Sequence, residues 1–89
     1  MLVVVAVESS TLASVGYDLT QGLLQLEFCS QAIYHYFGVP AGVHEALLEA
    51  PSKGRYFNRA IRGRFSYRRL ISAVAAGALN GRIPAGVGR

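Results

Sequence analysis

The amino-acid sequence predicts a single α+β domain, in which an antiparallel β-meander of three to four strands packs against two to three helices on one face. The first 39 residues consist of short apolar and β-branched segments separated by turn residues, a pattern typical of strands. Pro40 and Pro51 then delimit segments in which apolar residues recur at helical spacing. The 89 residues are 52% hydrophobic and 16% charged, which favours one folded domain with a small core. We expect this domain to span residues 1–79 and a flexible C-terminal tail to span residues 80–89.

The expected strands follow one another at short intervals. Residues 2–7 are rich in valine, and a second apolar segment at residues 12–17 follows a Ser-Ser-Thr interruption. Residues 18–22 form a turn, because aspartate can bond its own backbone and glycine readily adopts positive φ. Residues 23–28 alternate between apolar and polar, and a further strand is expected within residues 32–39. Connections this short force neighbouring strands to be antiparallel, so the strands form a meander.

Two helices are expected after the strands. Pro40 suits the first turn of a helix over residues 40–50, because the missing N–H of proline has no partner there in any case. Pro51 ends this helix, and Ser52 can cap a second helix over residues 52–62.

The second helix carries Phe57 and Ile61 on its buried side, and Gly63 is expected to end it. A third helix is expected over residues 66–79, where the sequence contains few polar residues. No internal repeat is visible in the chain.

Charge is distributed unevenly along the chain. All five acidic residues lie within the first 49 positions, and all nine basic residues follow them. Seven of the basic residues fall between Lys53 and Arg69, interleaved with aromatic residues. Such an asymmetry, with aromatics inside the basic block, indicates a polyanionic partner.

The second helix would present a ridge of arginines. Arg55, Arg59 and Arg62 repeat at spacings of four and three residues and so share one face of an α-helix. Arginine suits phosphate contacts because its guanidinium can donate two hydrogen bonds to one phosphate. The alternative is a solvated helix face that neutralises acidic residues elsewhere in the domain. The expected nucleic-acid-binding residues are Lys53, Arg55, Arg59, Arg62, Arg64, Tyr34 and Tyr36, with Arg68 and Arg69 widening the positive surface.

Tyr34 and Tyr36 lie on one face of the last predicted strand, and Ile33, His35 and Phe37 lie on the other. If the tyrosines are exposed, they can stack on bases as the aromatics of single-strand RNA binders do. If they face the helices, their rings pack in the core and their hydroxyls reach its rim. We favour the buried alternative, because aromatic pairs are more often part of a core.

The sequence provides little for catalysis or metal binding. One cysteine, Cys29, and two histidines, His35 and His44, are too few for a metal site, and no catalytic constellation is evident. We therefore expect a protein that is not an enzyme and has no cofactor or metal. Residues 1–7 lack the basic start of a signal peptide, and residues 70–79 are too short to span a membrane, so a cytoplasmic location is expected.

Several short motifs resemble the KTSC domain, a small bacterial family named for its occurrence at the C-terminus of some lysyl-tRNA synthetases. The matching motifs, in order, are Ser14-Val15-Gly16-Tyr17-Asp18, Tyr34-His35-Tyr36, Val39-Pro40, Ser52-Lys53-Gly54-Arg55-Tyr56-Phe57-Asn58 and Ile61-Arg62. The resemblance covers roughly residues 7–65. It implies a stand-alone or appended domain of unassigned function for which RNA binding has been suggested.

The sequence thus supports two hypotheses about function. The first is binding of RNA or single-stranded nucleic acid, mostly electrostatic and weakly sequence-specific. The second is a protein-interaction or self-association module without a nucleic-acid role. Self-association would make the protein a homo-oligomer. In that case the acidic half of one copy meets the basic half of another, or residues 1–7 pair with a partner strand.

Overall fold

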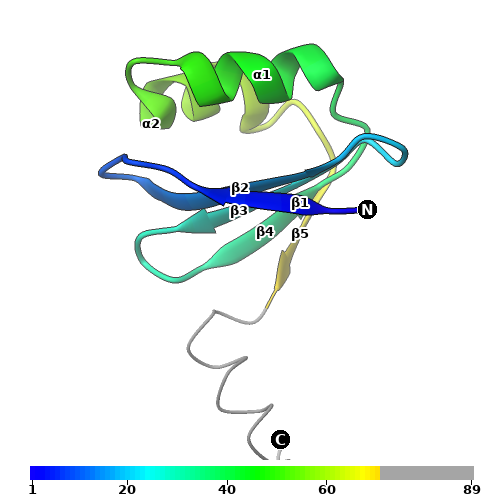
Figure 1. The fold of residues 1–89 in the computed structure, drawn as a ribbon, viewed down its shortest axis with the longest axis horizontal. Helices are drawn as coiled ribbons and strands as arrows, with labels where there is room; N and C mark the ends of the chain where they lie inside the picture. Colours follow the sequence, from blue (N-terminus) through cyan, green and yellow to red (C-terminus); the bar gives the residue numbers. More distant parts are fainter. Residues whose placement is uncertain (71–89) are drawn as a thin grey trace, which may run out of the picture.

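The computed structural model describes residues 1–70 as a five-stranded antiparallel sheet with helices on one face (Figure 1). The strands follow the order β1-β2-β3-β4-β5 across the sheet, so the predicted α+β meander is confirmed with one additional strand. The elements are β1 (Val3–Ala6), β2 (Leu12–Asp18), β3 (Leu23–Phe28), β4 (Ile33–Tyr36), α1 (Ala41–Glu49), α2 (Lys53–Tyr56), the π-helix η1 (Phe57–Ile61) and β5 (Tyr67–Leu70). The expected tail at residues 80–89 lies outside the described residues.

The turn between β2 and β3 is stabilised by an aspartate and a glycine, as the sequence predicts. The Asp18 carboxylate accepts hydrogen bonds from the Thr20 backbone N–H at 3.0 Å and from the Thr20 hydroxyl at 2.7 Å. Gly22 has a φ of 64°, which glycine adopts without steric cost. The hydrogen bonds of Thr20 to the charged form lower the pKa of the Asp18 carboxyl.

The second helix begins as predicted but does not continue as an α-helix. The Ser52 hydroxyl accepts a hydrogen bond from the Arg55 N–H at 3.3 Å, so Ser52 is its N-cap. After α2 the chain widens into η1, where the Arg62 N–H donates to the Phe57 carbonyl at 2.9 Å. This wider turn buries both Phe57 and Ile61, whereas Arg62 already has extended backbone and Gly63 has a φ of 75°.

The predicted third helix over residues 66–79 is wrong for the part that the structure describes. Tyr67–Leu70 instead form β5, which pairs antiparallel with β4, while residues 71–79 lie outside the described residues. The free edge of β4 satisfies the backbone groups of this segment, and the Phe37 N–H donates to the Ser66 carbonyl at 2.9 Å. Such pairing joins residues more than 30 positions apart in the chain (Tyr36 with Tyr67), so local periodicity does not reveal it.

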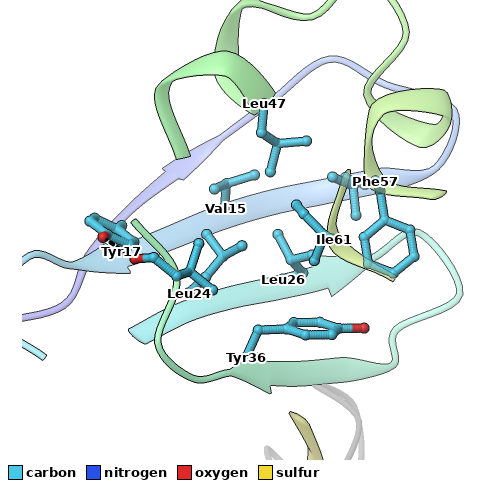
Figure 2. Close-up of a cluster of buried hydrophobic side chains, with 10 residues drawn as sticks. Val15, Tyr17, Leu24, Leu26, Tyr36, Leu47, Phe57 and Ile61 are labelled. Carbon is cyan, nitrogen blue, oxygen red and sulfur yellow. Dashed lines mark hydrogen bonds between the residues drawn. The ribbon is translucent and has the colours of Figure 1, made fainter. Parts of the chain in front are cut away.

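The core lies between the sheet and the helices. Figure 2 shows Leu47 from α1 and Ile61 from η1 directed toward the sheet residues Val15, Leu24 and Leu26. All five of these side chains are fully buried. Within residues 1–70, no helix covers the opposite face of the sheet (Figure 1).

Tyr17 connects the sheet to the start of the helical layer. Its buried hydroxyl donates a hydrogen bond to the carbonyl of Val39, in the connection between β4 and α1. Its ring stacks on the His44 imidazole of α1, with centroids 4.5 Å apart and an interplanar angle of 11°. Both contacts fix the position of α1 over β2.

We predict that Tyr17→Phe lowers the free energy of unfolding by about 1–2 kcal/mol, because the buried Val39 carbonyl loses its donor. Urea denaturation followed by circular dichroism measures the change. Tyr56→Phe is the matched control, since the Tyr56 hydroxyl takes part in none of the side-chain hydrogen bonds of the described residues. Equal stability of both variants with the wild type would show that this hydrogen bond contributes nothing to the fold.

Candidate nucleic-acid interface

Five aromatic rings gather where β3, β4 and β5 meet η1. Tyr34 and Tyr36 are stacked at 6.1 Å, and Tyr67 lies 5.7 Å from the first ring and 5.6 Å from the second. Phe28 approaches Tyr34 edge-on at 5.7 Å, and Phe57 approaches Tyr36 edge-on at 5.9 Å. Aromatic contacts at these separations are favourable, so the rings form one packed cluster.

The two predicted tyrosines face the helical side of the sheet. Tyr34 pairs across the sheet with Leu26, and Tyr36 pairs with Leu24, so each tyrosine shares a face with a core leucine. Figure 2 shows the Tyr36 ring beside Leu26, with its hydroxyl directed to the side where Phe57 lies. Exposure increases toward the sheet edge, from 3% for Tyr36 to 60% for Tyr67. Tyr36 is therefore part of the core, the alternative that the sequence favoured, Tyr34 packs half-buried against it, and Tyr67 lies at the surface.

A cavity of about 440 Å³ opens at this cluster, between the end of η1 and the sheet. Its lining residues are Phe28, Ser30, Ala32, Tyr34, Tyr36, Phe57, Arg62, Gly63, Tyr67 and Arg69. The Arg69 guanidinium carbon lies 6.0 Å from the centroid of the Tyr34 ring, within the range of a cation–π contact. Arg62 enters the lining because its backbone is extended after η1, rather than continuing the helix.

The Tyr36 hydroxyl stays protonated at neutral pH. Burial raises the pKa of the Tyr36 phenol, and the neighbouring Tyr34 and Tyr67 raise it further. The Arg62 cation acts in the opposite direction on this pKa without cancelling the increase. A neutral phenol can both donate and accept hydrogen bonds at the cavity wall.

Arg55 and Arg59 lie on a different part of the surface. They line a hollow of about 200 Å³ together with Tyr56 and residues 50–52. The Arg59 guanidinium carbon lies 5.4 Å from the centroid of the Tyr56 ring. The ridge expected from continuous α-helical spacing is thus divided, with Arg55 and Arg59 on one side of the helix and Arg62 at the aromatic cavity.

Lys53 and Arg64 each bond a backbone carbonyl. The Lys53 ammonium donates to the Ala50 carbonyl at the end of α1, at 3.1 Å, which satisfies one of the free acceptors of that helix terminus. The Arg64 Nε donates to the Arg59 carbonyl at 3.1 Å. Both cations therefore also stabilise the ends of helices, whatever else they contact.

The arginines do not neutralise the acidic half of the chain within residues 1–70. No arginine or lysine side chain in this part of the structure lies within 4.0 Å of a carboxylate oxygen. Arg62 has a long contact of 3.5 Å to the amide oxygen of Asn58. Arg55, Arg59, Arg62 and Arg64 are all exposed.

Of the two arginines expected to widen the positive surface, only Arg69 joins the cavity. Arg68 and Arg69 are neighbours in β5 and so point to opposite faces of the sheet. Arg68 pairs with His35, whose Nε2 lies 2.7 Å from the Gln25 side-chain oxygen. Burial lowers the pKa of His35, and the Arg68 cation lowers it further.

Sequence reasoning missed Phe28 and Tyr67 as site residues, and it expected Arg69 on the positive surface without placing it beside these rings. The signal was present in the alternation of Tyr67, Arg68 and Arg69, which places the outer two residues on one face of a strand. The prediction of a helix over residues 66–79 hid this alternation. In residues 1–70 no three histidine, cysteine, aspartate or glutamate side chains gather as metal ligands would. No helix in the same part of the chain is long and apolar enough to cross a membrane.

Comparison with known proteins supports the resemblance seen in the sequence. The KTSC domain model matches residues 8–65. The crystal structure of a KTSC domain protein from Yersinia pestis is similar with a TM-score of 0.77 at 37% identity, covering 80% of this chain and 100% of that one.

Two kinds of protein are similar to this chain in sequence. An uncharacterized protein from Stutzerimonas stutzeri is 54% identical over 55 residues, which are 62% of this chain and 78% of that protein. A lysine–tRNA ligase from a Nostoc species is 48% identical over 63 residues, which are 71% of this chain and 11% of the ligase. The chain thus corresponds to a small part of the ligase.

Proposed function

The chain belongs to the KTSC domain family, and from this premise we propose that it binds RNA or another single-stranded nucleic acid. The observation that carries the proposal is an open aromatic cavity flanked by exposed arginines that pair with no carboxylate in residues 1–70. Cations bind phosphates, and aromatic rings bind the faces of unpaired bases. Single-stranded nucleic acid presents both groups together.

The phosphate-binding role falls to the arginines on and beside the second helix. Arg55, Arg59 and Arg62 are exposed, so they can exchange water for phosphate oxygens without breaking an ion pair in the described part of the chain. Lys53 and Arg64 add positive potential at the ends of the helix while bonding backbone carbonyls. Binding through such contacts is electrostatic and depends steeply on salt.

Two further features favour a nucleic acid over other polyanions, and the second of them favours RNA. The chain places positive charge beside aromatic rings at the cavity. A binding site for a polyanion without bases would need the positive charge but not the rings. One group of relatives consists of lysine–tRNA ligases, whose name indicates that tRNA is a substrate. The matched segment makes up 11% of the ligase, so this similarity supports RNA as the first ligand to test.

We predict that replacing Arg55, Arg59 and Arg62 together with glutamate abolishes binding, because the phosphate contacts become repulsive. The measurement is a fluorescence-anisotropy titration with labelled tRNA, single-stranded RNA and duplex DNA, at about 50 and 200 mM salt. For the wild type, contact with about four phosphates gives a slope of log affinity against log salt near −3 for single strands.

A matched pair of single variants controls for the change in net charge. Arg62→Gln should weaken binding and reduce the salt slope by about 0.7, whereas Arg68→Gln, on the opposite sheet face, should change the slope little. Circular dichroism checks that every variant is folded. Undiminished affinity in a folded triple variant would contradict the proposal.

Self-association is the second candidate function, because one edge of the sheet is unprotected. β1 is an edge strand without charged residues or proline, and Val3, Val4 and Val5 are 61%, 47% and 43% exposed. Natural proteins usually protect such edges, so antiparallel pairing with β1 of a second copy would explain this one.

For this candidate we predict a dimer mass by light scattering that persists at high salt, because main-chain pairing of apolar strands is insensitive to screening. Val3→Lys should then restore the monomer. A dimer that dissociates as salt is added would instead indicate contact between the acidic and basic halves of two copies. A monomer under all conditions would contradict self-association.

A further inference from the structure

The aromatic cavity brings rings and cations together at one opening of the surface. Its volume of about 440 Å³ lies within the range of small-molecule sites in proteins. Its aromatic rings come from β3, β4, η1 and β5, and the loops after β3 and after η1 complete its lining, so secondary structure positions the rings before any ligand binds. A preformed site of this kind needs little ordering when its ligand enters.

The ring geometry suits a flat ligand. Tyr34 and Tyr36 are nearly parallel, with an interplanar angle of 22°, and Tyr67 is tilted by 46° and 34° against them. Tyr67 is also the most exposed of the three, so one of its faces is available at the mouth of the cavity. A planar heteroaromatic ring can stack there, which contributes about 1–3 kcal/mol per base in single-strand binders.

Two cations stand beside these rings on separate elements. Arg62 follows η1, and Arg69 lies in β5 with its guanidinium at the Tyr34 ring. Neither pairs with a carboxylate within residues 1–70. The site therefore offers a stacking surface and two anion-binding groups at one opening, and a nucleotide matches both because it presents a flat ring next to a phosphate.

We propose that this cavity binds one unpaired nucleobase, stacked on the exposed ring of Tyr67, while Arg62 and Arg69 contact the phosphates on either side of it. This inference rests on the proposed nucleic-acid binding and assigns its base-binding part to specific residues. A base in a duplex is not available to the cavity, so the pocket makes the domain prefer single strands. Stacking is tolerant of base identity, so we expect weak sequence preference.

The test compares Tyr67→Leu with Phe37→Leu, in titrations of a labelled single-stranded RNA of about eight nucleotides. Phe37 is the matched control because it is also an exposed aromatic residue but does not line the cavity. Tyr67→Leu should weaken binding about tenfold and leave the salt slope unchanged, since it removes stacking and no charge. Phe37→Leu should bind as the wild type does, and Tyr67→Phe should retain most of the affinity.

An abasic strand of the same length separates stacking from charge. On this strand the wild type and Tyr67→Leu should bind equally, because there is no base to stack. Titration with uridine 5′-monophosphate shows whether the cavity binds a single free nucleotide. Binding by the wild type that is lost in Tyr67→Leu would show that the cavity alone holds the base and its phosphate. Binding only to the strand would mean that the base is captured as part of a chain.

The titrations distinguish an error in the proposed base-binding cavity from an error in the proposed nucleic-acid binding. Salt-dependent binding of the single strand by the wild type, with equal affinity for Tyr67→Leu, would overturn the pocket and leave the arginine surface intact. Absence of binding by the wild type at low salt would overturn both. An effect of Tyr67→Leu that persists on the abasic strand would also overturn the pocket, because it would then reflect a change in the fold.

Discussion

The pairing of β5 with β4 is the constraint on which the candidate interface depends. The register places Tyr67 opposite Tyr36 and Arg69 opposite Tyr34, which extends the aromatic row of β4 by one strand. The preceding segment makes this pairing possible, since η1 ends at Ile61 and Gly63 adopts positive φ where the chain turns back. Without β5 the two tyrosines of β4 would be an edge of the core with no cavity beside them.

The motifs that resemble the KTSC family serve the fold more than the surface. Val15 lies in the core, and Tyr17 bonds the Val39 carbonyl. A Cβ atom on Gly54 would lie 2.5 Å from the Thr11 hydroxyl oxygen, so this helix packs closely on the loop before β2 because it carries a glycine there. The same motifs also contain Arg55 and Arg62, whose side chains are exposed, so these motifs contribute to the surface as well as to the packing of the helix.

The first four strands, the first helix and the start of the second helix could be predicted because their signals are local. Leu23–Phe28 alternates in the sequence and forms β3 over the same residues, and the Ser52 cap is visible as a residue type in a fixed place. The division of the arginine ridge could not be predicted, because one π-type hydrogen bond from Arg62 to Phe57 changes the direction of the following side chains. β5 could not be predicted either, since its stabilisation comes from an edge formed by distant residues. The roles of the site residues in binding remain predictions.

The central claim is that single-stranded RNA binds where η1 ends over β4 and β5. Chemical-shift mapping tests it most directly, by titrating ¹⁵N-labelled protein with a short single-stranded RNA. The account predicts perturbations concentrated at Tyr34, Tyr36, Arg62, Gly63, Tyr67 and Arg69, with smaller ones at Arg55 and Arg59. Perturbations confined to β1 and α1, or none at saturating RNA, would contradict the account and direct attention to the exposed edge of β1.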